Sequence, residues 1–319
     1  MTSAITAIGL TKHYPGVQAL TGLDLDVPTG SIYGFLGPNG AGKTTALKLL
    51  AGLARPTSGT ATVAGVSLEA GEAYKRAIGF LGQEPRFYDW MTGRETLRYA
   101  ASFYPWVEDP IEPRIAGLLD LVGLTDAAER RTGTYSGGMR QRLGIAQALV
   151  GRPSVLLLDE PVSALDPIGR KAAFDLLEQL KHDTTIFYST HILEDVERVS
   201  DYVAILDRGR LVRAAPTADL LGSFTRDQLR VTFAGTGAAT DVTAGLRGLA
   251  GVVSIEAASA DGSTRTYVLT VAPDAIDTIQ RAVQGFAASN DLLVTENSPV
   301  HLDLEEVFLR LIDPKEHAA

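Results

Sequence analysis

The sequence predicts an α/β fold in which a mixed sheet with much parallel pairing carries a phosphate-binding loop, followed by a small α+β unit. Short apolar runs typical of buried strands alternate with amphipathic stretches over the first two-thirds of the chain. One of these runs leads directly into a glycine-rich loop that ends in Gly42, Lys43 and Thr44. Beyond residue 222 the pattern changes to strands and helices in the order βαββαβ.

In the first two-thirds we expect a strand at Ser31–Leu36, a helix at Gly42–Leu53, and buried strands at Val155–Asp159 and Thr185–Ser189. The helix-prone region of residues 93–150 is long enough for a separate helical subdomain. The predicted domains are therefore residues 1–222 and residues 223–319.

In the second domain the expected strands are Gln228–Phe233, Val252–Ala257, Arg265–Val271 and Leu292–Glu296, with helices at Thr240–Leu249 and Asp274–Ala287. This order is that of the ferredoxin-like split motif.

Composition excludes several classes of protein. The formal net charge is -9 without a long basic run, which argues against nucleic acid as a partner because such binding needs Lys and Arg to neutralise phosphates. The absence of cysteine excludes disulfides, thiolate metal sites and cysteine nucleophiles. We find no signal-peptide pattern and no apolar run near the ~20 residues that span a bilayer. Any membrane-spanning helices would therefore come from other chains.

The loop from Gly37 to Thr44 reads GPNGAGKT and matches the phosphate-loop pattern G-x-x-x-x-G-K-[ST]. Its glycines let backbone N–H groups turn inward, and the following helix N-terminus adds to this anion nest. Lys43 is suited to the β- and γ-phosphates, Thr44 to Mg²⁺ and Thr45 to the α-phosphate. The expected nucleotide-binding residues here are Gly37, Asn39, Gly40, Gly42, Lys43, Thr44 and Thr45.

Two adjacent acids follow the apolar run at residues 155–158, at the point where a buried parallel strand should end. We expect Asp159 to hold Mg²⁺ and Glu160 to act as the general base that orients the attacking water. Phosphoryl transfer needs mainly positioning and charge neutralisation, so one oriented carboxylate suffices.

The segment Tyr135-Ser136-Gly137-Gly138-Met139 resembles the signature loop of ATP-binding cassette (ABC) proteins, usually Leu-Ser-Gly-Gly-Gln. Other motifs of that family occur in order: an upstream aromatic at Tyr14, the glutamine-loop residue Gln83, a D-loop at residues 163–166 that ends in Asp166, and the switch histidine His191. The resemblance covers about residues 4–222.

The resemblance implies an ATPase that works as a dimer, with a homodimer expected, on integral-membrane permease chains at the inner face of the cell membrane. It implies that Tyr14 stacks on adenine, that Gln83 contacts Mg²⁺ or the attacking water, and that His191 senses the γ-phosphate. Ser136, Gly137, Gly138 and Asp166 would serve ATP held by the second protomer. Ser136 and Gly138 are expected at the N-terminus of a helix, where their donors suit the γ-phosphate of that ATP. Tyr135 and Met139 depart from the family pattern, and the departure at Met139 removes any glutamine contact to the ribose.

Two segments keep open interpretations. The aromatic run Phe87–Met91 fits either core packing of the helical subdomain or the edge of a groove for a permease helix. The C-terminal helix Leu304–Ile312 is amphipathic and packs either on its own domain or in a dimer contact. This last domain resembles the appended domain of daunorubicin-resistance-type exporters, which implies export of a small molecule such as a drug, antibiotic or lipid-like compound. The alternative is a soluble ABC ATPase that acts on a non-transport partner.

Overall fold

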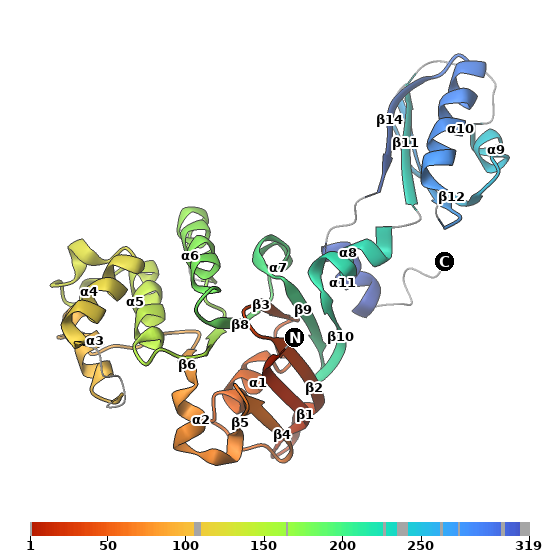
Figure 1. Ribbon diagram of the computed structural model, residues 1–319. Coiled ribbons are helices and arrows are strands. Elements are labelled where there is room, and N and C mark those ends of the chain that lie inside the picture. Colours follow the sequence, from red (N-terminus) through yellow and green to blue (C-terminus); the bar gives the residue numbers. More distant parts are fainter. Residues whose placement is uncertain are drawn as a thin grey trace. The chain divides into compact units, whose positions relative to one another are not determined.

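The computed structural model describes residues 2–104, 110–163, 165–225, 228–234, 242–261, 264–273, 275–300 and 304–312 (Figure 1). The chain divides into two compact units, Met1–Thr217 and Ala218–Ala319. The predicted helix starts Thr240 and Asp274, and Ala164 in the predicted D-loop, lie outside the described residues. None of the helices in the described part of the chain is long and apolar enough to cross a membrane.

A six-stranded sheet forms the centre of the first unit, in the order β10-β9-β3-β8-β7-β6. Five strands run parallel, and the edge strand β10 pairs antiparallel with β9. The strands are β3 (Ile32–Leu36), β6 (Ile78–Leu81), β7 (Val155–Asp159), β8 (Thr185–Thr190), β9 (Tyr202–Asp207) and β10 (Arg210–Pro216). β3, β7 and β8 are buried along their whole length. β3 and the first four residues of β7 therefore read as apolar runs in the sequence, whereas the apolar run of β8, residues 186–188, lies between Thr185 and Ser189.

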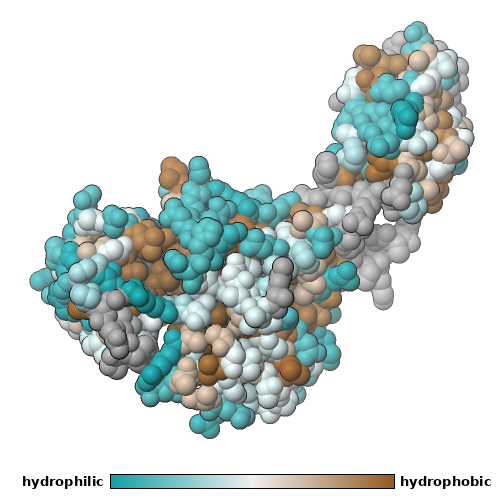
Figure 2. Space-filling model, viewed as in Figure 1, coloured by the Kyte–Doolittle hydropathy of each residue, from teal (hydrophilic) through white to brown (hydrophobic). Residues whose placement is uncertain are grey.

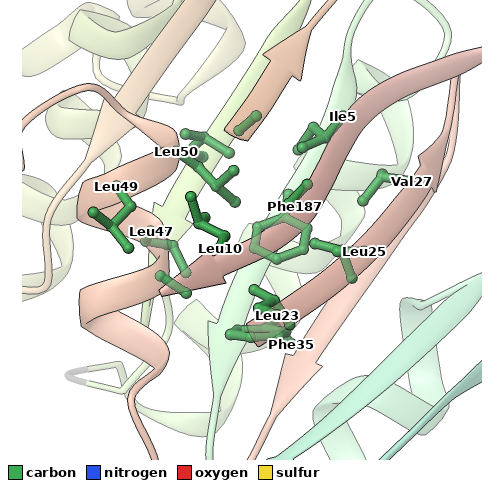
Figure 3. Packing of buried hydrophobic residues seen from close by; sticks show 14 of the residues in the cluster. Ile5, Leu10, Leu23, Leu25, Val27, Phe35, Leu47, Leu49, Leu50 and Phe187 are labelled. Carbon is green, nitrogen blue, oxygen red and sulfur yellow. The ribbon is translucent and has the colours of Figure 1, made fainter. Parts of the chain in front are cut away.

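A second, antiparallel sheet in the order β2-β1-β4-β5 belongs to the same unit. It consists of β1 (Ser3–Tyr14), β2 (Val17–Pro28), β4 (Ser58–Val63) and β5 (Val66–Ser67). Buried side chains of β1 and β2 pack with Phe35, Phe187 and the leucines of α1 (Lys43–Leu50), so the main core connects the antiparallel sheet, the central sheet and the phosphate-loop helix (Figure 3).

Helix α1 is shorter than predicted at both ends. Gly42 is left-handed and precedes the first helical residue, and the chain leaves the helix after Leu50 into a turn in which Gly52 has a φ of 68°. The other helices near the sheet are α2 (Glu72–Arg76), α6 (Pro167–Leu180) and α7 (Leu193–Val199).

The helical subdomain contains α3 (Gly93–Ala101), α4 (Ile111–Leu121) and α5 (Gly137–Leu149). Thr92 and Glu95 form a reciprocal capping box that fixes the start of α3. Short 3₁₀ turns cover Leu68–Ala70, Thr125–Ala127 and Thr132–Thr134. The subdomain lies within the region predicted for it, between β6 and β7.

The second unit has a four-stranded antiparallel sheet in the order β12-β13-β11-β14. Its elements are α8 (Thr217–Thr225), β11 (Gln228–Ala234), α9 (Val242–Arg247), β12 (Val252–Asp261), β13 (Thr264–Val271), α10 (Ile276–Ser289), β14 (Leu293–Pro299) and α11 (Leu304–Ile312). A separate core joins the sheet to α9 and α10 through Leu229, Leu246, Leu269 and Val283.

Candidate functional site

The glycine-rich loop connects β3 to α1 and is shaped by backbone that only glycine adopts easily. Gly42 has a φ of 106°, and a Cβ there would meet the carbonyl oxygen of Ala19 at 2.4 Å. Gly40 has a φ of 82° and would meet no atom within 4 Å. The left-handed residue at Gly42 turns the chain directly into α1, so the unpaired N–H groups of the helix start belong to the loop.

Lys43 is the buried cation of this loop, with 6% of its surface exposed. Its Nζ donates to the carbonyl oxygens of Gly37 at 2.7 Å and Pro38 at 3.2 Å. It also lies 3.9 Å from Oε1 of Glu160. Burial lowers the pKa of Lys43, and the carboxylates of Glu160 and Asp159 partly offset this effect. The charge is therefore held where a phosphate on the loop would meet it.

Asp159 ends β7 and is almost fully buried, at 2% exposure. Its Oδ1 accepts hydrogen bonds from Thr44 Oγ1 at 3.2 Å and Ser189 Oγ at 2.6 Å. A carboxylate beside a hydroxyl is the oxygen donor set that Mg²⁺ takes together with phosphate oxygens and water. Among the described residues, no group of three or more His, Cys, Asp or Glu side chains is arranged so that it could hold a metal ion by itself. These oxygens therefore suit a cation that arrives with a nucleotide.

Glu160 follows with a strained backbone, since its φ of 49° is unusual for a residue with a side chain. Its N–H donates to the carbonyl oxygen of Ser189 at 3.2 Å and to Ser189 Oγ at 3.0 Å. Oε1 lies 3.1 Å from His191 Nδ1, and Oε2 accepts from Gln83 Nε2 at 3.3 Å. The structure thus brings two of the residues predicted to be catalytic, Gln83 and His191, to the carboxylate of the third, Glu160, which is 11% exposed.

In this chain, the described polar residues of the signature loop and the D-loop cap the helices that follow them. Ser136 caps α5 and accepts from the N–H of Met139 at 3.2 Å, so the loop stands at a helix N-terminus as predicted. Asp166 caps α6 and accepts from the N–H of Gly169 at 2.8 Å. A Cβ on Gly138 would meet Leu165 at 3.1 Å. Among the described residues, the hydrogen bonds of Ser136 and Asp166 stay within these helix ends.

Tyr14 lies at the end of β1 and is 42% exposed. The Nζ of Lys12 lies 4.9 Å from the centre of its ring. The exposed ring leaves surface for stacking on a base, while the cation on the ring is a contact that sequence reasoning did not anticipate.

Sequence reasoning did not anticipate the contacts of two residues near the site. Ser189 was read only as the end of a strand, although it contacts both Asp159 and Glu160. Tyr135 points into the helical subdomain, is 6% exposed, and donates from its hydroxyl to the carbonyl oxygen of Ala127 at 2.6 Å. Burial raises the pKa of Tyr135. The departure from the family leucine is therefore a packing change in the subdomain.

Comparison with known proteins agrees with this geometry. Residues 20–163 match the family model described as ABC transporter. The chain is 40% identical over 234 residues to the daunorubicin/doxorubicin resistance ATP-binding protein DrrA of Streptomyces peucetius, covering 72% of this chain and 70% of the relative. It is 34% identical over 313 residues to the uncharacterized ABC transporter ATP-binding protein YdbJ of Bacillus subtilis, covering 95% of this chain and 93% of the relative.

The chain is also similar in structure to an ATP-binding cassette solved as a dimer in a post-hydrolysis state with ADP and Pi. The TM-score is 0.62 at 25% identity, and the match covers 67% of this chain and 98% of that chain. The 40% identity to DrrA extends over more than two-thirds of the length of that relative. Together with the match to the family model and with the phosphate loop and carboxylate pair, it shows that this chain belongs to the ATP-hydrolysing subunits of ABC transporters.

Proposed function

We propose that this protein drives export of a small molecule through separate permease chains, by closing two copies of itself around two ATP molecules and opening them after hydrolysis. The observation that carries the proposal is the division of the site within one chain. Lys43, Asp159 and Glu160 converge, whereas Ser136 and Asp166 cap helices and make no bond to the phosphate loop among the described residues. The second half of each site is thus best supplied by another copy.

ATP binding rests on the loop backbone and Lys43, whose charge-assisted bonds to Gly37 and Pro38 would be exchanged for bonds to phosphate oxygens. Thr44 and Asp159 are the residues that would hold Mg²⁺. Gln83, the third residue expected to contact the ion, is hydrogen-bonded to the neighbouring Glu160. Such an ion, when bound, neutralises the charge that develops on the transferred phosphoryl group.

Glu160 is the group best placed to orient the attacking water and to accept its proton. His191 contacts the same carboxylate and is 40% exposed, so its ring can turn toward a γ-phosphate without unfolding the strand end. When the shared γ-phosphate is lost, the attraction between the two halves falls and the dimer opens.

Dimer closure would use the surface around the signature loop and D-loop. Ser136 and Gly138 stand at the N-terminus of α5, whose dipole and free N–H groups favour an anion from a second protomer. Ile168, the second residue of α6, is 81% exposed. Figure 2 shows a small hydrophobic patch at the tip of α6 on an otherwise mixed surface. These features favour contact with a second copy of the chain.

A permease segment would dock on the aromatic surface of the helical subdomain. Tyr88 and Trp90 are 47% and 65% exposed, and their rings lie 4.7 Å apart, whereas Phe87 and Met91 are half-buried. Phe87, Tyr88 and Met91 line a cavity of about 270 Å³ together with Tyr99 and Phe103. The half-buried side chains fit core packing, and the exposed rings fit the edge of a groove for a permease helix.

This aromatic surface is tied to the signature loop by the backbone. Thr132, which is 1% exposed, donates from its hydroxyl to the carbonyl oxygen of Tyr88 at 3.0 Å and from its N–H to that of Met91 at 2.8 Å. Gly133 donates to the carbonyl oxygen of Asp89 at 3.2 Å. Because Ser136 follows only three residues later, a push on Tyr88 or Trp90 would be transmitted to the signature loop.

The second unit has the element order and strand order of a ferredoxin-like split motif, and we assign it that fold. It holds none of the residues assigned to ATP. With the permease in the membrane, the protein would work as a peripheral subunit at the inner face. Small-molecule export is supported by the 40% identity to a subunit named for daunorubicin and doxorubicin resistance.

Co-purification from membranes tests this function. A tagged chain should retain an integral-membrane partner, and the pair in vesicles should hydrolyse ATP faster than the isolated subunit while accumulating an exported compound. Trp90→Ala should retain several-fold less of the partner, and Ile8→Ala, at an exposed apolar position in β1, should retain as much as the unaltered chain. If the tagged chain and both variants co-purify only with a soluble protein, and never with a membrane protein, the transport function is contradicted.

A further inference from the structure

We infer that Ser189 is a positioning residue for hydrolysis: its hydroxyl holds Asp159 in the orientation that receives Mg²⁺ and fixes the strained backbone that aims Glu160. The inference deepens the proposed function and rests on it. It assigns a role to a residue that none of the family motifs identified above contains.

Ser189 lies directly opposite Asp159 in the parallel pair of β7 and β8. It is 0% exposed and follows the apolar residues Ile186, Phe187 and Tyr188. A buried hydroxyl in such a strand must find partners, because an unpaired polar group in the interior is costly. The register between β7 and β8 places Ser189 next to those partners, Asp159 and Glu160, where β7 ends.

The hydroxyl bridges the two acidic residues, with one hydrogen bond to each. Its oxygen accepts from the N–H of Glu160 at 3.0 Å, and its proton is donated to Oδ1 of Asp159 at 2.6 Å. A serine hydroxyl has one proton and two lone pairs, so both bonds can exist together. The bond to Asp159 is shorter than the bond from Thr44 to the same oxygen, at 3.2 Å. Ser189 therefore orients the carboxylate even when Thr44 turns toward a metal.

The same hydroxyl helps to retain the unfavourable backbone of Glu160. A φ of 49° persists in a residue with a side chain only where the surroundings determine it. The N–H of Glu160 is shared between the hydroxyl and the carbonyl oxygen of Ser189. This conformation directs the carboxylate toward Gln83 and His191. Loss of the hydroxyl removes one of the two acceptors and leaves the other.

The test compares Ser189→Val with Ser189→Thr. The two replacement side chains have nearly the same shape, but only threonine keeps the hydroxyl. The matched control is Thr184→Val, which removes a buried hydroxyl that donates to the carbonyl oxygen of Pro153 at 2.9 Å, immediately before the same strand and away from the acids. Binding of a fluorescent ATP analogue is measured first in EDTA and then as Mg²⁺ is titrated, followed by the rate of hydrolysis.

In EDTA all variants should bind the analogue within about twofold of the unaltered protein, because Lys43 and the loop are untouched. Removing a partner that orients a metal ligand typically costs about 10- to 100-fold. Ser189→Val should therefore need at least about tenfold more Mg²⁺ for its half-maximal effect and should lose a similar factor in kcat. Ser189→Thr and Thr184→Val should stay near the unaltered protein.

Equal Mg²⁺ requirements in Ser189→Val and Ser189→Thr would overturn the inference, whether both are normal or both are impaired. If the threonine variant does not fold, Ser189→Ala against Ser189→Cys replaces the pair, with the same expectation that the side chain able to donate to Asp159 performs better. If the unaltered protein itself shows no Mg²⁺-dependent ATP binding, the proposed function fails rather than the role of Ser189.

Discussion

The two halves of the nucleotide site differ in how complete they are within one chain. Around the phosphate loop, Lys43, Asp159 and Glu160 lie within hydrogen-bonding or ion-pair distance of one another or of shared neighbours. Around the signature loop, Ser136 and Asp166 cap their own helices. The comparison teaches that, if the proposed function holds, one chain would suffice to hold ATP, whereas hydrolysis would need a second chain.

The largest effect on the phosphate-loop half of the site should come from Lys43→Ala, which should lower the affinity for ATP. Loss of a charge-assisted contact to a buried phosphate costs about 2–5 kcal/mol, so the affinity for ATP should fall by about 30- to 4,000-fold. Equilibrium binding to the isolated subunit measures it, with circular dichroism as the check on folding. Near-normal affinity would mean that the loop is not the main phosphate contact.

Ser136→Ala should reduce ATP hydrolysis but leave ATP binding almost unchanged, the opposite emphasis to Lys43→Ala. ATP binding to one chain should stay within about threefold, while ATP-dependent hydrolysis falls by at least about tenfold, because a donor to the partner's γ-phosphate is lost. The substitution also removes a helix cap worth about 1 kcal/mol. Thr92→Ala removes a comparable cap from α3 and should leave basal hydrolysis almost unchanged. Weakened binding of ATP to the single chain would show that the two halves are not separable.

Tyr88→Ala and Trp90→Ala should reduce permease-stimulated hydrolysis several-fold while basal hydrolysis and the unfolding midpoint change little. The reason is that both rings are exposed, at 47% and 65%, and outside the core. Assays of the subunit with and without its permease in vesicles separate these effects. A joint collapse of stability and basal activity would place the rings in the core.

The smallest effect is expected from removal of the part of the second unit that follows α8. A chain that ends after Thr225 keeps α8 whole and retains every residue assigned to ATP. It should bind ATP within about threefold of the full chain, since the two units have separate cores. Nucleotide titration of the folded truncation measures this. Loss of binding in a folded product would mean that the second unit completes the site.

Sequence reasoning works where a local pattern dictates the structure. The run at residues 155–159 predicts β7 with the same bounds because a strand buried on both faces is apolar throughout. The signature serine predicts the start of α5 because it caps the helix. The antiparallel sheet of β1, β2, β4 and β5 was not anticipated as a separate layer, since alternating burial identifies a strand but not the sheet it joins.

The remaining features depend on contacts between distant residues. Ser189 is a common residue in a strand, and only the register between β7 and β8 places it against Asp159. Tyr135 carries no local sign that its hydroxyl reaches Ala127. The aromatic run at residues 87–91 contains both half-buried and exposed rings, and its composition alone does not separate them.

The most direct test of the two-chain site is the mass of Glu160→Gln with Mg-ATP, measured by light scattering after size exclusion. The amide keeps the shape and hydrogen bonding of Glu160 but cannot accept a proton from water, so the closed ATP-bound dimer should accumulate. Its mass should be twice that of the 33.9 kDa chain. Adding Lys43→Ala to the same protein should return it to a monomer, because ATP no longer joins the halves. A Glu160→Gln protein that remains a monomer at saturating Mg-ATP, both alone and with its permease, would contradict the account.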